Sequence, residues 1–153
     1  MTSFFSCDWG TTSFRLRRVN AATGDVMDER REASGAKALF SSCAPGGTAA
    51  REEVFANFLR EQLCLMAGND VASLDGASVI ISGMASSSVG WGELPYAHVP
   101  VDLDGSSLFR DSLDLDVGGN RRMRIHLISG VCADVDMMRG EETEILGLFS
   151  GGR

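Results

Sequence analysis

The pattern of apolar and polar residues predicts three short strands at the start of the chain. Residues Ser3–Asp8 are largely apolar, and residues Phe14–Val19 begin with apolar side chains alternating with arginines. A weaker strand pattern covers Asp25–Glu32, after turn residues. The short connections between these segments predict an antiparallel meander.

Helical and strand patterns then alternate along the rest of the chain. Apolar residues recur at helical spacing over Arg51–Ala67 and again over Arg139–Phe149, which predicts two helices. The β-branched run Ser78–Ser82 predicts a strand buried on both faces, and the alternating segment Met123–Ile128 predicts another strand.

The segments between these elements read as turns and loops. Residues Gly83–Trp91 are rich in small residues and are expected to turn and begin a short helix, whereas the acidic segment Asp104–Asn120 is expected to be a loop. The resulting order is β-β-β-α-β-α-β-α. It predicts an α/β protein with a mixed five-stranded sheet covered by helices.

Length and charge limit the classes of function. The 153 residues suit one domain, and the net charge of −7 argues against coating a nucleic acid, which needs clustered Lys and Arg. No apolar run reaches the ~18 residues that cross a bilayer, and the start lacks a basic leader, so a cytoplasmic protein without membrane partners is expected. The four cysteines form no CxxC pair, which favours free thiols over a zinc site.

The segment Asp8-Trp9-Gly10-Thr11-Thr12 carries the clearest candidate chemistry. A carboxylate ends the first strand, and a Gly-Thr-Thr bend offers close backbone approach together with N–H and O–H donors for phosphate. Asp8 is a candidate ligand for hydrated Mg²⁺. The alternative is an ordinary hairpin in which Asp8 caps a turn.

Two later segments carry further candidates. After the buried strand, Gly83–Trp91 combines small and hydroxyl residues with an aromatic, at the end of a strand where open α/β sheets bind ligands. The alternative is a helix start with Trp91 packed in the core. In Met137–Glu144, Arg139 suits a carboxylate or phosphate, and Glu141 or Glu142 could accept a proton. The alternative is that these carboxylates only favour the helix dipole.

Taken in order, these motifs resemble a known family. The first motif, with Arg15, is similar to the first phosphate motif of the actin-like ATPase and sugar kinase superfamily. The stretch from Gly83-Met84 to Gly90-Trp91 resembles the 2-dehydro-3-deoxygalactonokinase family, as do the segments that follow it: Pro95-Tyr96, Val99-Pro100 and Met138-Arg139-Gly140-Glu141-Glu142-Thr143. The resemblance runs from about Phe5 to Gly147 and implies a ribonuclease-H-like lobe, which the predicted element order matches.

The resemblance implies an ATP- and Mg²⁺-dependent phosphorylation of the terminal hydroxyl of 2-dehydro-3-deoxy-D-galactonate, in galactonate catabolism. It implies catalytic roles for Asp8, Arg139 and Glu141, with Asp8 also holding the metal. It implies nucleotide contacts from Gly10, Thr11, Thr12 and Arg15, and sugar-acid contacts from Gly83, Met84, Ser87 and Trp91.

Members of that family are about twice as long and have two lobes. Residues 1–153 are therefore expected to form a single N-terminal lobe that lacks the second lobe and is inactive alone. The face toward a missing lobe would be open to self-association. The alternatives are a non-catalytic remnant or interaction module of the same fold, and a kinase for another sugar acid.

Overall fold

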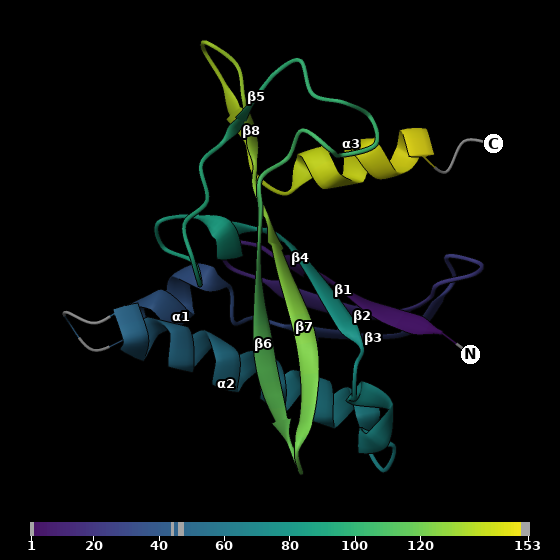
Figure 1. Cartoon of the computed structure of the whole chain (residues 1–153). Helices are drawn as coiled ribbons and strands as arrows, with labels where there is room; N and C mark the ends of the chain where they lie inside the picture. The colour runs from purple at the N-terminus through teal and green to yellow at the C-terminus, as the bar shows by residue number, and fades with distance from the viewer. Residues whose placement is uncertain (1, 44, 46–47, 151–153) are drawn as a thin grey trace.

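A mixed sheet of six strands forms the centre of the molecule (Figure 1). The computed structural model describes residues 2–43, 45 and 48–150. The strands lie in the order β3 (Val26–Glu32), β2 (Phe14–Asn20), β1 (Ser3–Trp9), β4 (Ser78–Gly83), β7 (Arg121–Ile128) and β6 (Arg110–Gly118).

The pairing of these strands decides which chain segments meet. Strands β1, β2 and β3 form an antiparallel meander, and β6 pairs antiparallel with β7. By contrast, β1 pairs parallel with β4, which pairs parallel with β7. In this register Asp8 lies opposite Arg15 on one side and Ser82 on the other. The carboxyl ends of β1 and β4 therefore open at the same edge of the sheet.

Two helices, α1 (Ala36–Ser42) and α2 (Thr48–Ala67), cover one face of the sheet. The helical spacing of α2 buries Phe55, Leu59 and Leu63 completely. They join inward-facing strand residues in one core. Trp9 lies within this core, with ring centroids 4.9–6.4 Å from those of Phe14, Phe55, Phe58 and Trp91. Such aromatic packing fixes the end of β1 against the helices.

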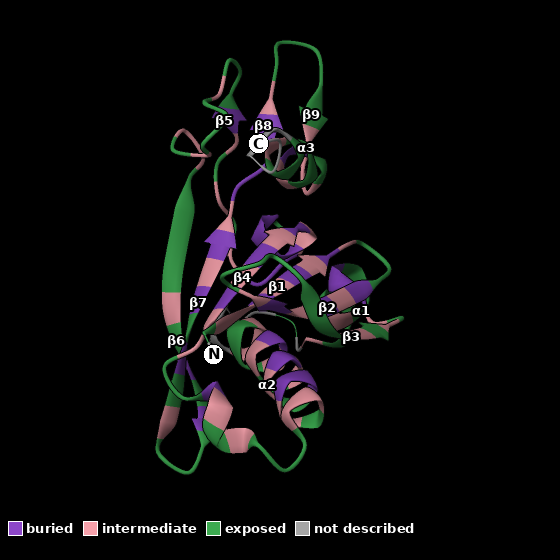
Figure 2. Ribbon diagram, turned by 90° about the vertical axis from the view of Figure 1, so that its right-hand side faces the viewer, coloured by how far each residue is buried: buried purple, intermediate pink, exposed green. Residues whose placement is uncertain are grey.

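A second, smaller group of elements lies beyond the carboxyl edge of the main sheet (Figure 2). It contains β5 (Ala97–His98), β8 (Val131–Cys132) and β9 (Met137–Met138), which form a three-stranded sheet. Helix α3 (Glu141–Ser150) follows β9. The short 3₁₀ turns Val71–Leu74 and Met84–Ser86 lead into and out of β4.

The structure confirms the mixed α/β architecture, the three-strand meander, β4, β7 and the two predicted helices. The prediction of five strands is wrong, because the segment expected to be an acidic loop contains β6. Its inward positions Leu115 and Val117 are buried, whereas the alternating aspartates point to solvent. Helix α1 was not expected. Among the described residues, no helix is long and apolar enough to cross a membrane.

Candidate active site

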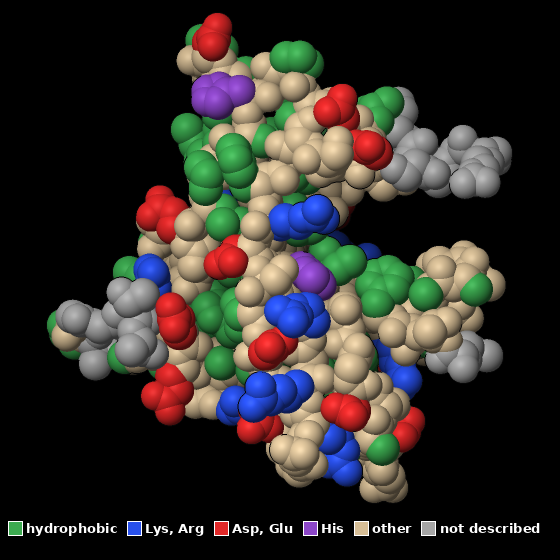
Figure 3. Space-filling model, in the orientation of Figure 1, with side chains coloured by type: hydrophobic (Ala, Val, Ile, Leu, Met, Phe, Trp, Pro, Cys, Tyr) green, Lys and Arg blue, Asp and Glu red, His purple; other side chains and the backbone are tan. Residues whose placement is uncertain are grey.

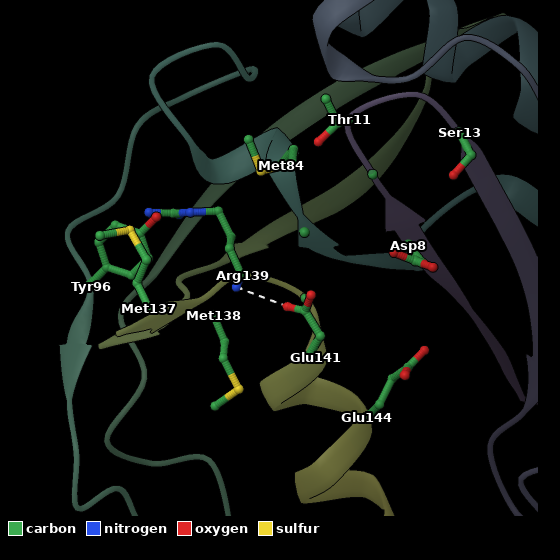
Figure 4. Close-up of a pocket in the computed structure, with 13 residues that line it drawn as sticks. Asp8, Thr11, Ser13, Met84, Tyr96, Met137, Met138, Arg139, Glu141 and Glu144 are labelled. Carbon is green, nitrogen blue, oxygen red and sulfur yellow. Dashed lines mark hydrogen bonds between the residues drawn. The ribbon is translucent and has the colours of Figure 1, made fainter. Parts of the chain in front are cut away.

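A pocket of about 470 Å³ opens where the two groups of elements meet (Figure 4). Three segments contribute to its lining: residues 8–13 at the end of β1 and in the bend after it, residues 83–84 at the end of β4 together with Tyr96, and residues 137–144 from β9 into α3. Figure 3 shows the surface hollowed between α3 and the main sheet. The pocket therefore lies at the carboxyl ends of parallel strands, where open sheets bind ligands.

Gly83 allows the floor of this pocket to close. Its φ is +93°, and a Cβ at this position would lie 2.7 Å from the carbonyl oxygen of Trp9. A Cβ on Gly140, where α3 begins, would lie 3.2 Å from the Cα of Gly83. No side chain fits at position 83 without moving the backbone. The three lining segments thus touch through their main chains.

The carboxylate of Asp8 stands at the pocket beside two charged neighbours. Nη2 of Arg15 lies 2.9 Å from Oδ2 of Asp8 and 3.5 Å from Oε1 of Glu144 on α3. The Asp8 side chain remains 46% exposed, whereas that of Arg15 is 26% exposed. Arg15 therefore holds the Asp8 carboxylate in place while leaving it open to the pocket.

Arg139 connects three parts of the site. Its Nη1 donates to the backbone oxygen and the hydroxyl of Ser86, at 2.5 and 2.7 Å, and its Nη2 donates to the Leu94 carbonyl at 3.3 Å. The guanidinium lies over the ring of Tyr96, 4.1 Å from its centroid. These contacts fix the 86–96 segment relative to β9.

The acidic residues at the start of α3 satisfy backbone donors. Oε2 of Glu141 accepts from the Arg139 N–H at 3.1 Å, and Oε2 of Glu142 accepts from the Gly140 N–H at 2.7 Å. Glu141 is exposed and lines the pocket. Glu142 is 2% exposed, and its burial raises the pKa of its carboxyl. Glu142 is a helix-start residue rather than a pocket residue.

The structure brings together seven of the eleven residues that the sequence singled out. Asp8, Gly10, Thr11, Gly83, Met84, Arg139 and Glu141 all line the pocket. Thr12 is exposed outside this lining, and Arg15 reaches the site through Asp8.

Ser87 and Trp91 are not brought to the pocket. The Ser87 hydroxyl donates to the Met84 carbonyl at 2.7 Å, and Trp91 is 3% exposed, packed against Trp9 and Phe55. Both side chains thus make structural contacts outside this pocket, because Trp91 returns to the core after a tight turn, and their contacts with a sugar acid stay a prediction.

Six further residues line the pocket without having been assigned a ligand contact from the sequence: Ser13, Tyr96, Met137, Met138, Gly140 and Glu144. Tyr96 comes from a segment without periodicity, and a methionine pair reads more simply as core. The short connection predicted between strands Ser3–Asp8 and Phe14–Val19 is the available signal for Ser13, because such a bend lies at the edge where the strands end.

Fold and pocket together define an α/β protein with a cavity at the carboxyl ends of its parallel strands, and comparison with known proteins identifies the family. The family model for 2-keto-3-deoxy-galactonokinase matches residues 8–153, so the chain belongs to this family.

Two curated relatives and one crystal structure extend this match. The chain is 31% identical over 155 residues to "Probable 2-dehydro-3-deoxygalactonokinase DgoK1" of Rhizobium meliloti (strain 1021), covering 94% of the chain and 41% of the relative. It is 28% identical over 148 residues to the 2-dehydro-3-deoxygalactonokinase of Escherichia coli (strain K12), with the same coverage of each protein. The chain thus spans about two fifths of the length of these relatives.

The "Crystal structure of a putative 2-dehydro-3-deoxygalactonokinase protein from Sinorhizobium meliloti" superposes with a TM-score of 0.71 at 28% identity. The superposition covers 96% of the chain and 42% of the crystallised protein. The fold described above is therefore shared with the corresponding part of a longer protein.

Proposed function

We propose that this chain forms the N-terminal lobe of a 2-dehydro-3-deoxygalactonokinase, which phosphorylates the terminal hydroxyl of 2-dehydro-3-deoxy-D-galactonate with ATP. The observation that carries the proposal is the shared pocket: residues 8–13 and 137–144 line one cavity, in a chain of this family. The strand order β3-β2-β1-β4-β7, a meander followed by parallel strands, supports a ribonuclease-H-like assignment for this lobe.

The residues present fit a magnesium-bound nucleotide. Three pocket carboxylates, those of Asp8, Glu141 and Glu144, would repel a bare triphosphate, so a divalent cation must accompany it. Mg²⁺ in nucleotide sites uses one or two carboxylates besides phosphate oxygens and water. Asp8 would hold this ion, and the 10–12 bend with Arg15 would face the phosphates. Bound ATP supplies the phosphoryl group, and Mg²⁺ offsets its charge.

The sugar acid would occupy the side of the pocket formed by Gly83, Met84, Tyr96 and the methionines of β9. Small and apolar surfaces leave room there for a short carbon chain. Both terminal nitrogens of Arg139 already donate to Ser86 and Leu94. Arg139 would therefore attract the substrate carboxylate by its charge while it positions the 86–96 segment.

Glu141 would accept the proton of the attacking hydroxyl. Its side chain is exposed at the pocket, and the hydrogen bond from the Arg139 N–H holds one carboxylate oxygen in place. A carboxylate fixed in this way can orient a hydroxyl and take its proton as the bond to phosphorus forms. Asp8 is committed to Arg15 and to the metal, which favours Glu141 for this step.

Methionine methyl signals test binding in the pocket directly. Met84, Met137 and Met138 line it, whereas Met27 is in the edge strand β3 and Met123 is in the core. In a ¹³C-methyl-methionine sample, the sugar acid and Mg-ATP should each shift the pocket signals and leave Met27 and Met123 unchanged. Shifts spread over all methionines, or none at millimolar ligand, would count against the site.

Turnover is measured separately, as ADP released on addition of the sugar acid. We expect this lobe alone to bind without turning over, since the curated relatives contain about 2.4 times its length. If ATP and the sugar acid both bind in this pocket, the alternative that the chain is a remnant that binds no ligand is excluded. A stronger shift with a different sugar acid would redirect the proposal to another kinase of this fold.

A further inference from the structure

We propose that Cys132, paired with His98, is a thiol modification site that exchanges with small disulfides. It lies in the small sheet and takes no part in the proposed phosphoryl transfer. The proposal rests on the pairing of a nucleophile with a base, on the environment of the other thiols, and on a cavity beside the sulfur. It does not depend on the kinase assignment.

The sheet register places the two side chains together. Strands β5 and β8 pair parallel, with His98 directly opposite Cys132, and the backbone N–H of Val99 donates to the Cys132 carbonyl at 2.9 Å. The Sγ of Cys132 lies 3.6 Å from Nδ1 of His98. His98 is exposed and Cys132 is half-buried, so reagents and water reach the pair. A nucleophile within hydrogen-bond reach of a base is the arrangement that activates a thiol.

Among the described contacts, the sulfur atoms of the other three cysteines are buried or face a backbone carbonyl instead of an imidazole. Cys7 is fully buried, and burial, with a smaller contribution from the Asp8 charge, raises the pKa of its thiol well above its usual range. Sγ of Cys43 donates to the Leu39 carbonyl at 3.3 Å, and Sγ of Cys64 faces the Val117 carbonyl at 4.0 Å. A carbonyl cannot take the proton, whereas an imidazole can.

A cavity of about 170 Å³ adjoins Cys132 and gives the incoming group a place to lie. It is lined mainly by apolar side chains, including Val99, Val131 and Met138. In the exchange, the Cys132 proton passes to His98 and the thiolate attacks one sulfur of the disulfide. One S–S bond forms, the original one breaks, and the leaving thiolate takes the proton from His98. The products are a mixed disulfide on Cys132 and one free thiol.

The modified thiol would lie next to the site pocket. Cys132 pairs with Met137 across β8 and β9, and both Met137 and Met138 line the cavity as well as the site pocket. A group bound to Cys132 therefore changes the environment of these two methionines. Their methyl signals report the modification without any measurement of activity.

Dithiodipyridine, a neutral aromatic disulfide, tests the proposal because it releases a coloured thione with each exchange. With less than one equivalent, peptide mapping of the wild-type chain should find the label first on Cys132. Cys132→Ser should remove the fastest kinetic phase. His98→Asn should slow this phase roughly tenfold or more, since the positioned base is lost. The methyl signals of Met137 and Met138 should shift, and that of Met27 should not.

Two variants serve as matched controls. His126→Asn removes the other histidine, whose Nδ1 is 2.8 Å from the Ser112 hydroxyl, and should leave the fast phase unchanged. Cys43→Ser should remove only a slower phase. Label found first on Cys43 or Cys64 in the wild-type chain would overturn the proposal, and so would an unchanged fast phase in a folded His98→Asn variant.

Discussion

Arg139 lies over the ring of Tyr96, 4.1 Å from its centroid, and the same guanidinium donates to Ser86 and Leu94. One side chain thus joins the start of α3 to the segment that follows β4. The site depends on this connection because the lining segment at the end of β4 and the one that runs from β9 into α3 belong to different sheets.

Arg139→Lys keeps the charge but removes the fork of donors. We expect it to lower the free energy of unfolding by about 1–3 kcal/mol, since partly buried carbonyls lose their partners. Arg124→Lys is the control, because Arg124 forms a surface ion pair with Asp114 and should cost less than about 1 kcal/mol. Urea unfolding of both variants measures the difference, and equal losses would contradict the positioning role.

Gly83→Ala should destabilise the protein more than Gly24→Ala. Both glycines have positive φ, +93° and +77°, so each alanine costs about 1–2 kcal/mol in backbone strain. Only at position 83 would the new Cβ also meet the Trp9 carbonyl, whereas Gly24 has nothing within 4 Å. We therefore expect Gly83→Ala to lower the free energy of unfolding by about 1–3 kcal/mol more than Gly24→Ala does. Unfolding curves check the order, and a reversed order would refute the close contact.

Asp8→Asn should weaken the binding of Mg-ATP by roughly tenfold or more, because a neutral amide is a poor ligand for Mg²⁺. Asp114→Asn is a close control: Asp114 is 47% exposed and paired with an arginine at 3.1 Å, much as Asp8 is 46% exposed and paired at 2.9 Å. Titration calorimetry gives both affinities. If the two substitutions had the same effect, Asp8 would have no special place in the nucleotide site.

Glu142→Gln should change how stability depends on pH. Burial raises the pKa of the Glu142 carboxyl above its ordinary 4.5, so the folded chain holds this proton more tightly than the unfolded chain. The contribution of Glu142 to the free energy of unfolding is fully present below pH 4.5 and is lost as the pH rises through the raised pKa. The variant should therefore gain stability relative to the wild type in urea unfolding as the pH rises above the ordinary value of 4.5. Parallel profiles would show that Glu142 does not titrate abnormally.

The sequence predicts the elements whose apolar residues keep a regular period, such as α2 around Phe55 and Leu59. It does not predict β6, because Asp111, Asp114 and Asp116 give an edge strand the composition of a loop. The two-residue strands β5, β8 and β9 are too short for any period. They form because the surrounding chain brings them together.

The candidate site follows the same division. Asp8 and Gly83 lie at the ends of two predicted strands that pair in parallel, so strand topology brings them to one edge. Arg139 begins a predicted helix and is held at this edge by its contacts with Ser86, Leu94 and Tyr96. Trp91 was placed at the site by its motif, yet its large apolar surface packs into the core with Trp9. Tyr96 belongs to the family motif but receives no site role from the sequence, because its position depends on Arg139, which is 43 residues away along the chain and contacts it only in the folded structure.

Because β1 and β4 pair in parallel, the two ends of the sheet differ in how far their loops can change in length. The connections at residues 21–25, 68–77 and 118–120 all lie at the end away from the pocket, where insertions meet mainly solvent. At the pocket end, main chains already touch, as at Gly83 and Gly140. Changes in loop length among homologues should therefore accumulate at the end of the sheet away from the pocket, while the pocket end tolerates little beyond exchange of surface side chains.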